Sequence, residues 1–248
     1  MEKIMQHPIV SQESWLAARK ELLVKEKELT RQRDRLSEAR RALPWVRISK
    51  EYVFDGPEGE VTLAELFKGR SQLVVYHFMF GPGWEVGCSG CSFLADHVEG
   101  PFLHLHHHDV SFVAVSRAPY RKIAAFQQRM GWKFAWVSSF GRDFNYDFHV
   151  SFTEEEVAKG EGLYNFGLQK INTDELPGVS VFYKDEEGEI FHTYSTYGRG
   201  ADDLLGAYMF LDLTPLGRNE TGPNGDQQDW VRLHDMYIEG PIASSCCH

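Results

Sequence analysis

The sequence predicts an α/β fold, in which a mixed central sheet is flanked by helices and preceded by one long helix. Two continuous apolar runs, residues 73–80 and 110–115, are rich in strand-forming side chains, as expected of buried parallel strands. A helix is predicted over residues 120–130, because an amphipathic segment there ends at Gly131. Strands that alternate with helices along the chain are typical of this fold class.

The remaining elements predict a chain of three parts. We expect an N-terminal amphipathic helix over residues 11–43, a folded domain over 45–216 and a loop-like C-terminal extension over 217–248. Turn residues between apolar strands predict two hairpins in the domain. The other segments expected are hairpin strands at 52–54, 61–63, 179–183 and 190–194, a strand at 134–137, and helices at 64–67, 92–97, 102–108, 154–159 and 202–211.

The composition is that of an ordinary globular protein. The chain has 248 residues, is 42% hydrophobic and 25% charged, and carries a formal net charge of −10. This acidic balance argues against a protein that binds nucleic acid mainly through charge. No apolar run approaches the roughly 20 residues of a membrane span, and the first residues form no signal peptide. We therefore expect a cytoplasmic protein without a nucleic-acid or membrane partner.

The N-terminal helix carries a narrow apolar stripe. One large apolar residue recurs every seven positions, and Pro44 ends the pattern. The favoured interpretation is a helix packed on its own domain. A homodimer formed through this helix is the second interpretation, and a basic helix that contacts nucleic acid is the third. The stripe residues are Trp15, Leu22, Leu29, Leu36 and Leu43.

The most informative feature is the pair Cys88-x-x-Cys91, which follows the first buried strand where a helix is expected to begin. Ligands and chemistry gather at the carboxyl ends of such strands. A thiolate is the reactive species in disulfide exchange, and a helix N-terminus stabilises it. Cys88 would therefore be the catalytic nucleophile, and Cys91 would resolve the mixed disulfide. This chemistry uses a thiol or disulfide of a protein or small molecule as its partner, and we expect no cofactor.

Two other interpretations of the pair remain open. Cys88 and Cys91 together with His104 and His108 have the spacing of a zinc finger, but Gly100-Pro101 falls where the finger's helix should run. No metal is therefore expected, and the histidines at 104–108 are interpreted as a solvated helix end. The second interpretation is a pair of inert buried thiols. The glycines that flank Cys88 favour a flexible, exposed loop instead.

Several motifs in the sequence resemble one bacterial thioredoxin-like family. That family is known as a domain of unknown function, is labelled a predicted dithiol–disulfide oxidoreductase, and lies within the thioredoxin/peroxiredoxin superfamily. The resemblance implies a thioredoxin-like, peroxiredoxin-type fold and thiol–disulfide exchange at Cys88 and Cys91. It spans residues 15–220. The motifs that carry it lie at residues 26–31, 40–45, 71–80, 91–93, 115–119, 130–132, 143–148 and 192–195. Residues 55–59 and 61–67, with the strand at 73–80 and the cysteine pair, resemble the opening of peroxiredoxin-type domains of the same superfamily.

The sequence also departs from the thioredoxin pattern. Thioredoxin has Trp before its first cysteine and Gly-Pro between the two, whereas Gly87 precedes Cys88 here. Trp84 is close by and is expected to contact the substrate. Pro177 is the candidate for the cis-proline that faces the dithiol in thioredoxin-like sites, and it is the second expected substrate contact.

Two further function classes stay open. In a thiol-dependent peroxidase, Thr or Ser would stand three residues before the reactive cysteine, but Glu85 stands there. Arg117 or Arg199 could supply a countercharge, although a surface salt bridge is the favoured role of each. A non-catalytic binding module with the same fold is the other class. In the tail, Cys246 and Cys247 could deliver a resolving thiol, and disorder is the favoured interpretation.

Overall fold

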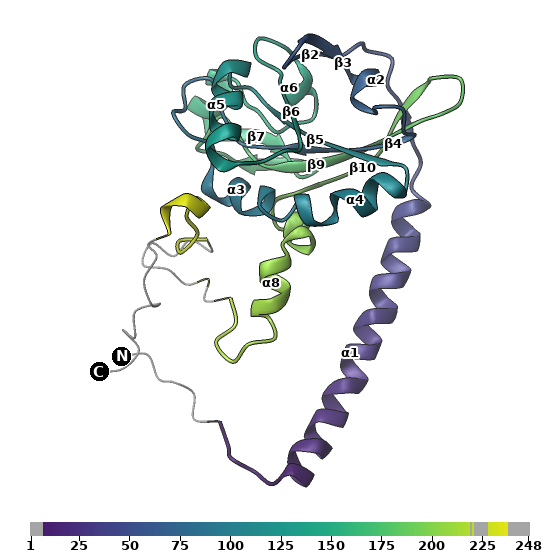
Figure 1. The fold of residues 1–248 in the computed structure, drawn as a ribbon, viewed down its shortest axis with the longest axis vertical. Coiled ribbons are helices and arrows are strands. Elements are labelled where there is room, and N and C mark those ends of the chain that lie inside the picture. The colour runs from purple at the N-terminus through teal and green to yellow at the C-terminus, as the bar shows by residue number, and fades with distance from the viewer. Residues whose placement is uncertain (1–6, 219, 221–227, 238–248) are drawn as a thin grey trace. The chain divides into compact units, whose positions relative to one another are not determined.

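The computed structural model describes residues 7–218, 220 and 228–237 of the chain. The chain divides into two compact units, residues 1–44 and residues 45–248. The predicted α/β class, with its mixed sheet and long N-terminal helix, is confirmed (Figure 1). Within the described residues, no helix is both long enough and apolar enough to cross a membrane.

The first unit consists of a single long helix, α1 (Gln12–Arg41), as the sequence predicts. Ser11 caps its N-terminus, because the Ser11 side chain accepts a hydrogen bond from the amide of Ser14 at 3.2 Å. None of the helix's residues is buried. Every member of the apolar stripe is therefore exposed, Trp15 at 52% and Leu36 at 50%, for example.

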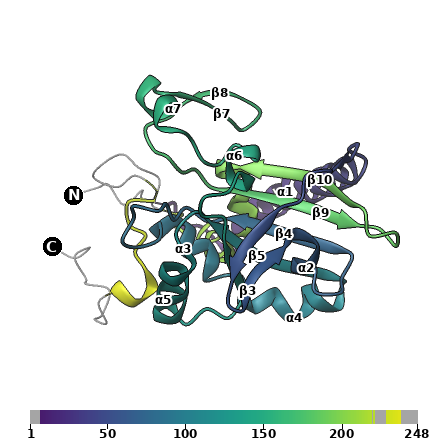
Figure 2. The same ribbon diagram turned by 90° about the horizontal axis from the view of Figure 1, so that it is seen from above.

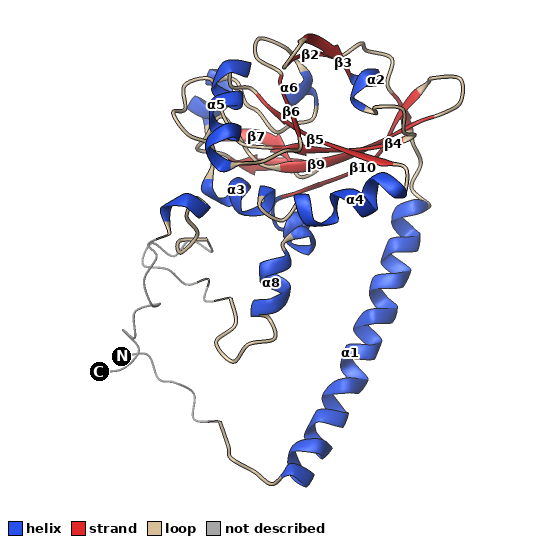
Figure 3. Ribbon diagram, viewed as in Figure 1, coloured by secondary structure: helices blue, strands red, loops and turns tan. Residues whose placement is uncertain are grey.

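The second unit is built on an eight-stranded mixed sheet (Figure 3). Its strand order is β1-β10-β9-β4-β5-β6-β2-β3, in which β4 pairs with β5 in parallel and with β9 in antiparallel orientation. The predicted buried strand at 73–80 is thus real but ends earlier, at His77. The strands are β1 (Val46–Arg47), β2 (Val53–Gly56), β3 (Gly59–Thr62), β4 (Gln72–His77), β5 (Val110–Ser116), β6 (Ala135–Ser138), β9 (Gly178–Lys184) and β10 (Ile190–Tyr197).

The helices cover both faces of this sheet (Figure 1). The predicted helix over 102–108 begins earlier than expected, because Gly100 and Pro101 lie inside its first turn, where proline is tolerated. The predicted last helix is split by Leu205 into a 3₁₀ segment, Gly198–Leu204, and α8. The helices are α2 (Leu63–Leu66), α3 (Ser89–Ala95), α4 (Glu99–His107), α5 (Tyr120–Met130), α6 (Phe144–Asp147), α7 (Glu154–Lys159) and α8 (Gly206–Leu211).

A second, two-stranded sheet is a feature that the sequence did not predict. Strands β7 (Glu161–Tyr164) and β8 (Gly167–Lys170) form a hairpin that extends from the main sheet (Figure 2). Its turn residues, Asn165 and Phe166, both have positive φ, as a tight hairpin turn requires. The usual Asn-Gly signal is absent because phenylalanine occupies the second position, and the hairpin was therefore not recognisable from its turn.

Alternate residues of β4 face two separate cores, which is the ordinary consequence of strand geometry. Leu73 and Val75 belong to the core shared with β2, α2 and α6. Tyr76 belongs to the core shared with α3, α5 and α8, which also contains Cys91. The sheet therefore separates the cysteine side of the molecule from the side that carries α6.

His77, the last residue of β4, is a buried polar group on the α6 side. It is 1% exposed and packs against the rings of both Phe144 and Phe148. Its Nε2 atom is 2.8 Å from Ser180 Oγ, and Ser180 in turn hydrogen-bonds Ser195. Burial lowers the pKa of His77 from 6.5 to about 3, because the charged imidazolium would lie away from water.

This burial predicts that acid destabilises the domain. The unfolded chain protonates His77 near pH 6.5 whereas the folded domain does not, so stability is lost as the pH falls below 6.5 toward 3. Between pH 6.5 and about 5 the loss from this group is about 2 kcal/mol. In urea unfolding across this range, His77→Gln should show a shallower pH dependence than the wild type. The exposed His107→Gln is the control, and equal slopes for wild type and His77→Gln would contradict the assignment.

Candidate active site

Cys88 lies where the chain passes from the central strand β4 into helix α3. It is the N-cap residue of α3, and its Sγ atom accepts a hydrogen bond from the amide of Cys91 at 3.4 Å. The two thiols are thus one helical turn apart on the same side of the helix. The predicted position of the pair, after the first buried strand and at a helix N-terminus, is confirmed.

One residue of the preceding loop contacts both cysteines through its backbone. The Met79 carbonyl accepts a hydrogen bond from the amide of Cys88 at 3.1 Å. The Met79 amide donates to Cys91 Sγ at 3.4 Å. The end of the strand and the start of the helix are therefore joined directly at the dithiol.

The two thiols differ in their exposure to solvent. Both cysteines are present as thiols rather than as a disulfide, with Cys88 half-buried and Cys91 2% exposed. Burial raises the pKa of the Cys91 thiol well above its ordinary value, and the neighbouring Cys88 acts in the same direction. Cys88 is thus the thiol that an external partner can reach, and Cys91 is held behind it.

Close packing requires the glycine before Cys88, which corrects the expectation of a flexible, exposed loop there. Gly87 is buried, and a Cβ atom there would lie 2.7 Å from ring carbons of both Phe78 and Phe126. At Gly90 a Cβ atom would lie 2.1 Å from the side-chain oxygen of Gln228, which is the end of a flexible side chain. The chain approaches its neighbours too closely for a side chain at Gly87.

Trp84, an expected substrate contact, is half-buried and packs against the same core as Cys91. Its indole lies over Gly81, where a Cβ atom would be 2.9 Å from Trp84 Nε1. Lys122 holds this loop by donating to the Trp84 carbonyl at 3.0 Å and pairs with Glu85 at 3.5 Å. The Glu85 side chain is 90% exposed, so it is directed into solvent. Contact of Trp84 with a substrate stays a prediction.

Pro177 precedes β9 directly, at the strand end that pairs with the end of β4, since His77 is opposite Gly178. The expectation of a cis-proline is wrong, because the structure has no cis peptide bond among the described residues. The Pro177 carbonyl instead accepts a hydrogen bond from the Tyr164 hydroxyl at 2.7 Å. A side chain of the unpredicted β7–β8 hairpin thus fixes this loop.

One tyrosine side chain, which no motif of the sequence marked, shares a core with the buried thiol. Tyr76 and Cys91 belong to the same buried cluster, and both are 2% exposed. In the sequence Tyr76 looks like one more strand-forming residue in a continuous apolar run, so only the fold shows which core it enters.

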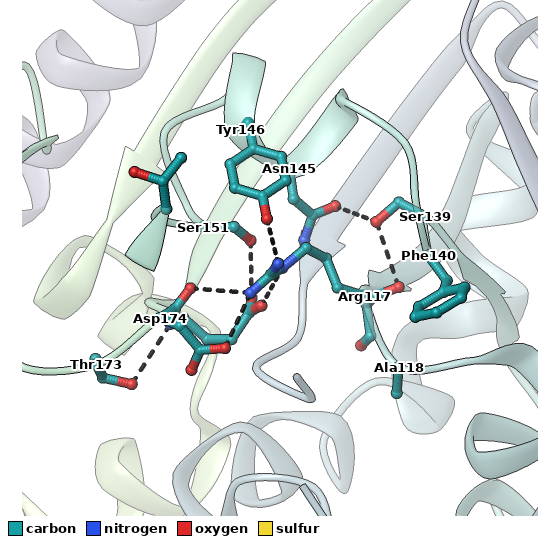
Figure 4. A network of polar contacts seen from close by, with 12 residues as sticks. Arg117, Ala118, Ser139, Phe140, Asn145, Tyr146, Ser151, Thr173 and Asp174 are labelled. Atoms are coloured by element: carbon teal, nitrogen blue, oxygen red, sulfur yellow. Dashed lines mark hydrogen bonds and ion pairs between the residues drawn. The ribbon is translucent and has the colours of Figure 1, made fainter. Parts of the chain in front are cut away.

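Arg117 is buried rather than on the surface, which overturns its expected role as a surface salt bridge (Figure 4). It donates to Glu175 through Nε and to Asp174 at 3.0 Å, and the Tyr146 hydroxyl is a further partner. Burial raises the pKa of Glu175 to about 7, although Arg117 acts to lower it. The guanidinium is already engaged by two carboxylates. A countercharge role for Arg117 at Cys88 therefore gains no support.

The other expected charges and ligands lie elsewhere. Arg199 is 59% exposed and pairs with Asp202, as the surface interpretation expects. His104 and His108 are exposed at the C-terminal end of α4. Across residues 7–218, 220 and 228–237, no three His, Cys, Asp or Glu side chains are grouped closely enough to hold a metal ion.

His192 and the aromatic motif at 143–148 do not join the cysteines. His192, Asp147 and Phe148 line a cavity of about 490 Å³ with the β7–β8 turn. Neither cysteine contributes to its lining, and Phe148 belongs to the core on the α6 side of the sheet. The pocket that these motifs line is therefore separate from the dithiol.

A segment near the C-terminus, Gln228–Tyr237, packs beside the dithiol. Its Val231 and Leu233 are 2% and 4% exposed in the core that contains Cys91, and Trp230 packs edge-on against Phe93 of α3. Gln228 reaches the turn at Gly90. The tail was predicted to be loop-like, but the apolar spacing of residues 230, 231 and 233 was a signal for burial. Cys246 and Cys247 lie outside the described residues.

Comparison with known proteins identifies the family of this chain. Residues 4–237 match the family described as "Bacterial protein of unknown function (DUF899)", and the chain belongs to it. This confirms the bacterial family of unknown function that the motifs indicated. No curated protein matches the chain.

Solved structures with a similar fold are distant. Peroxidoxin BcpB from Mycobacterium tuberculosis is 15% identical, with a TM-score of 0.43 over 63% of this chain and 90% of that chain. Peroxiredoxin Q from Xanthomonas campestris is 14% identical, with a TM-score of 0.40 over 64% and 90%. Similarity at this level assigns no activity to this chain.

The packing of the Gln228–Tyr237 segment predicts that it stabilises the domain. Leu233→Ala should lower the free energy of unfolding by about 2–5 kcal/mol, because a buried leucine is removed and a cavity remains. The matched control is Met236→Ala in the same segment, where the side chain is 57% exposed and the expected change is within about 0.5 kcal/mol. Urea unfolding measures both, and equal stabilities of the two variants would contradict the packing.

Proposed function

We propose that this protein is a thiol–disulfide oxidoreductase whose active site is the Cys88–Cys91 dithiol. One observation carries the proposal: a half-buried Cys88 thiol caps helix α3 while a buried Cys91 thiol lies one turn behind it. Exchange needs an accessible nucleophile and a second thiol within reach, and this arrangement provides both. The family resemblance of the motifs supports the same chemistry.

The reaction proceeds in two displacements. The Cys88 thiolate attacks a disulfide RS–SR′, forms a bond to sulfur R and expels R′S⁻, which takes up a proton. The Cys91 thiol then loses its proton and attacks Cys88 Sγ. The Cys88–Cys91 disulfide forms, RS⁻ leaves and is protonated, and the substrate has gained two electrons from the dithiol. A thiol reductant restores the starting state.

The roles of the two cysteines follow from their surroundings. The amide of Cys91 donates to Cys88 Sγ, and the aligned amides at a helix N-terminus favour negative charge on that sulfur. Cys91 lies in the core, where an external disulfide cannot approach it. The half-buried Trp84 and Pro177 are the proposed substrate contacts near the dithiol, and the substrate is a disulfide of a protein or small molecule.

The two cysteines should respond differently to substitution. Incubation with oxidised glutathione, followed by alkylation and mass spectrometry, should show a Cys88–Cys91 disulfide in the wild type. Cys91→Ser should stop at the glutathione adduct of Cys88, because no resolving thiol remains. Cys88→Ser can form neither this disulfide nor the adduct at position 88, and its buried Cys91 should stay a thiol.

A control background removes the remaining thiols. Cys246→Ser with Cys247→Ser leaves only the dithiol and should keep the wild-type result. A Cys88→Ser variant that reduces disulfides at the wild-type rate would overturn the proposal. Oxidation of Cys88 by hydrogen peroxide, without turnover of disulfides, would favour the peroxidase class instead.

We also infer that α1 mediates a homodimer. Large apolar side chains recur every seven residues along the helix and are about half exposed, which is typical of a coiled-coil seam without its partner. The same helix in a second copy of the chain carries an identical stripe, and the two stripes can pack against each other.

The dimer has its own test. The triple variant Leu22→Gln, Leu29→Gln, Leu36→Gln should be monomeric by light scattering coupled to size exclusion, because the seam loses its apolar contacts. A double variant two residues further along the helix, Arg31→Gln with Glu38→Gln, changes the opposite face and should stay dimeric. A wild-type chain that is monomeric at micromolar concentration would refute the inference.

A further inference from the structure

We propose that the cavity of about 490 Å³ at the end of α6 is a binding site for a small aromatic amine in its ammonium form. This site goes beyond the proposed function, because neither cysteine of the dithiol lines it. Its wall includes parts of two motifs, residues 143–148 and 192–195, that thiol–disulfide exchange leaves without a role. Its size, its aromatic rings and two unfilled hydrogen-bond acceptors define the ligand.

Four separate parts of the chain form the cavity. The end of α6, the turn of the β7–β8 hairpin, strand β10 and the segment between β1 and β2 each contribute lining residues. Its volume lies within the range of roughly 300–1,000 Å³ that is usual for sites of small molecules. The cavity therefore has room for a ligand with one or two rings.

Aromatic rings make up much of the wall. Tyr52, Phe148, Phe166 and Tyr197 all line the cavity. The ring centroids of Phe166 and Tyr197 are 5.4 Å apart, and those of Tyr52 and Phe148 are 6.2 Å apart. Three of these residues are buried, whereas Phe166 is 78% exposed in the hairpin turn. Such rings pack against flat apolar groups, and their faces attract cations.

The charge beside the cavity is negative. Asp147 lines it, and among the described residues neither a lysine nor an arginine does. Lys50 pairs with Asp147 at 2.6 Å, but the same ammonium group also pairs with Asp143 at 2.8 Å. One positive charge thus serves two carboxylates. The other polar lining residues, His149 and Asn165, are exposed. A cationic ligand therefore fits this charge better than an anionic one.

Two acceptor atoms of the lining residues are unfilled. Lys50 and the Tyr52 hydroxyl both donate to Asp147 Oδ2, and no described residue bonds to Oδ1. His192 donates through Nε2 to the Tyr194 carbonyl at 3.0 Å, since a carbonyl can only accept. Burial lowers the pKa of His192, so the ring is neutral at pH 7 and its Nδ1 atom is an acceptor. An ammonium group, which has three donors and no acceptor, matches both atoms.

The test compares three ligands of one shape. The probes are 2-phenylethylamine, which is protonated at pH 7.5, neutral 2-phenylethanol and anionic phenylacetate, each titrated into the full chain by isothermal titration calorimetry up to millimolar concentration. The amine should bind one to one. The alcohol should bind at least about 10-fold more weakly, the factor for losing a hydrogen bond to a charged group, and the anion should not bind. Equal affinity for all three, or no binding of the amine, would overturn the proposal.

Two substitutions test the location of the site. Asp147→Asn removes the charge that meets the ammonium group, so it should weaken amine binding about 10-fold or more and leave the affinity for the alcohol unchanged. Phe166→Gly keeps the proposal testable if Asp147→Asn fails to fold. Phe166 is exposed in a turn and has a φ of 66°, which glycine adopts without strain. Loss of its ring should weaken amine binding about 2- to 30-fold.

Two control variants should bind the amine with wild-type affinity. Phe210→Ala removes a ring that is 74% exposed in α8, outside the cavity. Cys88→Ser changes the dithiol, which is separate from the cavity. Wild-type amine affinity in both Asp147→Asn and Phe166→Gly would overturn the proposal, and so would loss of binding in Cys88→Ser. Because binding is measured without thiol chemistry, its outcome is distinguishable from a failure of the proposed function.

Discussion

The geometry of the candidate active site depends on how strand β4 passes into helix α3. A helix leaves its first amides without intrahelical partners, and Cys88 satisfies one of them with its own sulfur. The same residue donates its amide back to the carbonyl of Met79, in the loop that follows the strand. Since Cys88 makes both of these hydrogen bonds, its thiol is held in place by backbone groups of the two elements that it joins.

Strand alternation then determines what surrounds each group. Tyr76 and Phe78 face the cysteine side of the sheet, whereas Val75 and His77 face the α6 side. A shift of β4 by one residue would exchange these sets and place the imidazole, rather than the phenol, in the core that contains Cys91. The pairing of β4 with β5 and β9 along its length prevents that shift. The chemistry of the buried thiol is in this way a consequence of sheet register.

The sequence was sufficient for those elements whose signals are local. Apolar runs located β4 and β5, an amphipathic segment ending at Gly131 located α5, and the Cys-x-x-Cys spacing located the dithiol. Features that depend on distant partners could not be found in this way. The cis-proline prediction failed because it was carried over from a family pattern, while here Tyr164, from a hairpin with an unusual turn, binds Pro177.

Glycines show the same limit in another form. From the sequence, Gly87 and Gly90 predict a flexible segment. A glycine makes the backbone flexible only where no neighbouring side chain packs against it. In the fold Gly87 passes between two phenylalanine rings, and Gly90 lies under Gln228, more than a hundred residues away. Rigid close packing and flexible turns use the same residue type. The distinction requires knowing which distant side chains arrive at that place.

Burial of Cys91 has a kinetic consequence that differs from its effect on the resting states. The thiol form and the disulfide form of the pair are both neutral at Cys91, so neither one requires a buried charge. In the proposed reaction, only the transient thiolate of the second displacement does. Burial would thus leave the reduced and oxidised proteins intact while it raises the barrier between them, except where donors oppose it. The Met79 amide donates to that sulfur at 3.4 Å. Under the proposed function, a dithiol built in this way would resist unassisted oxidation and still complete an exchange that has begun at Cys88.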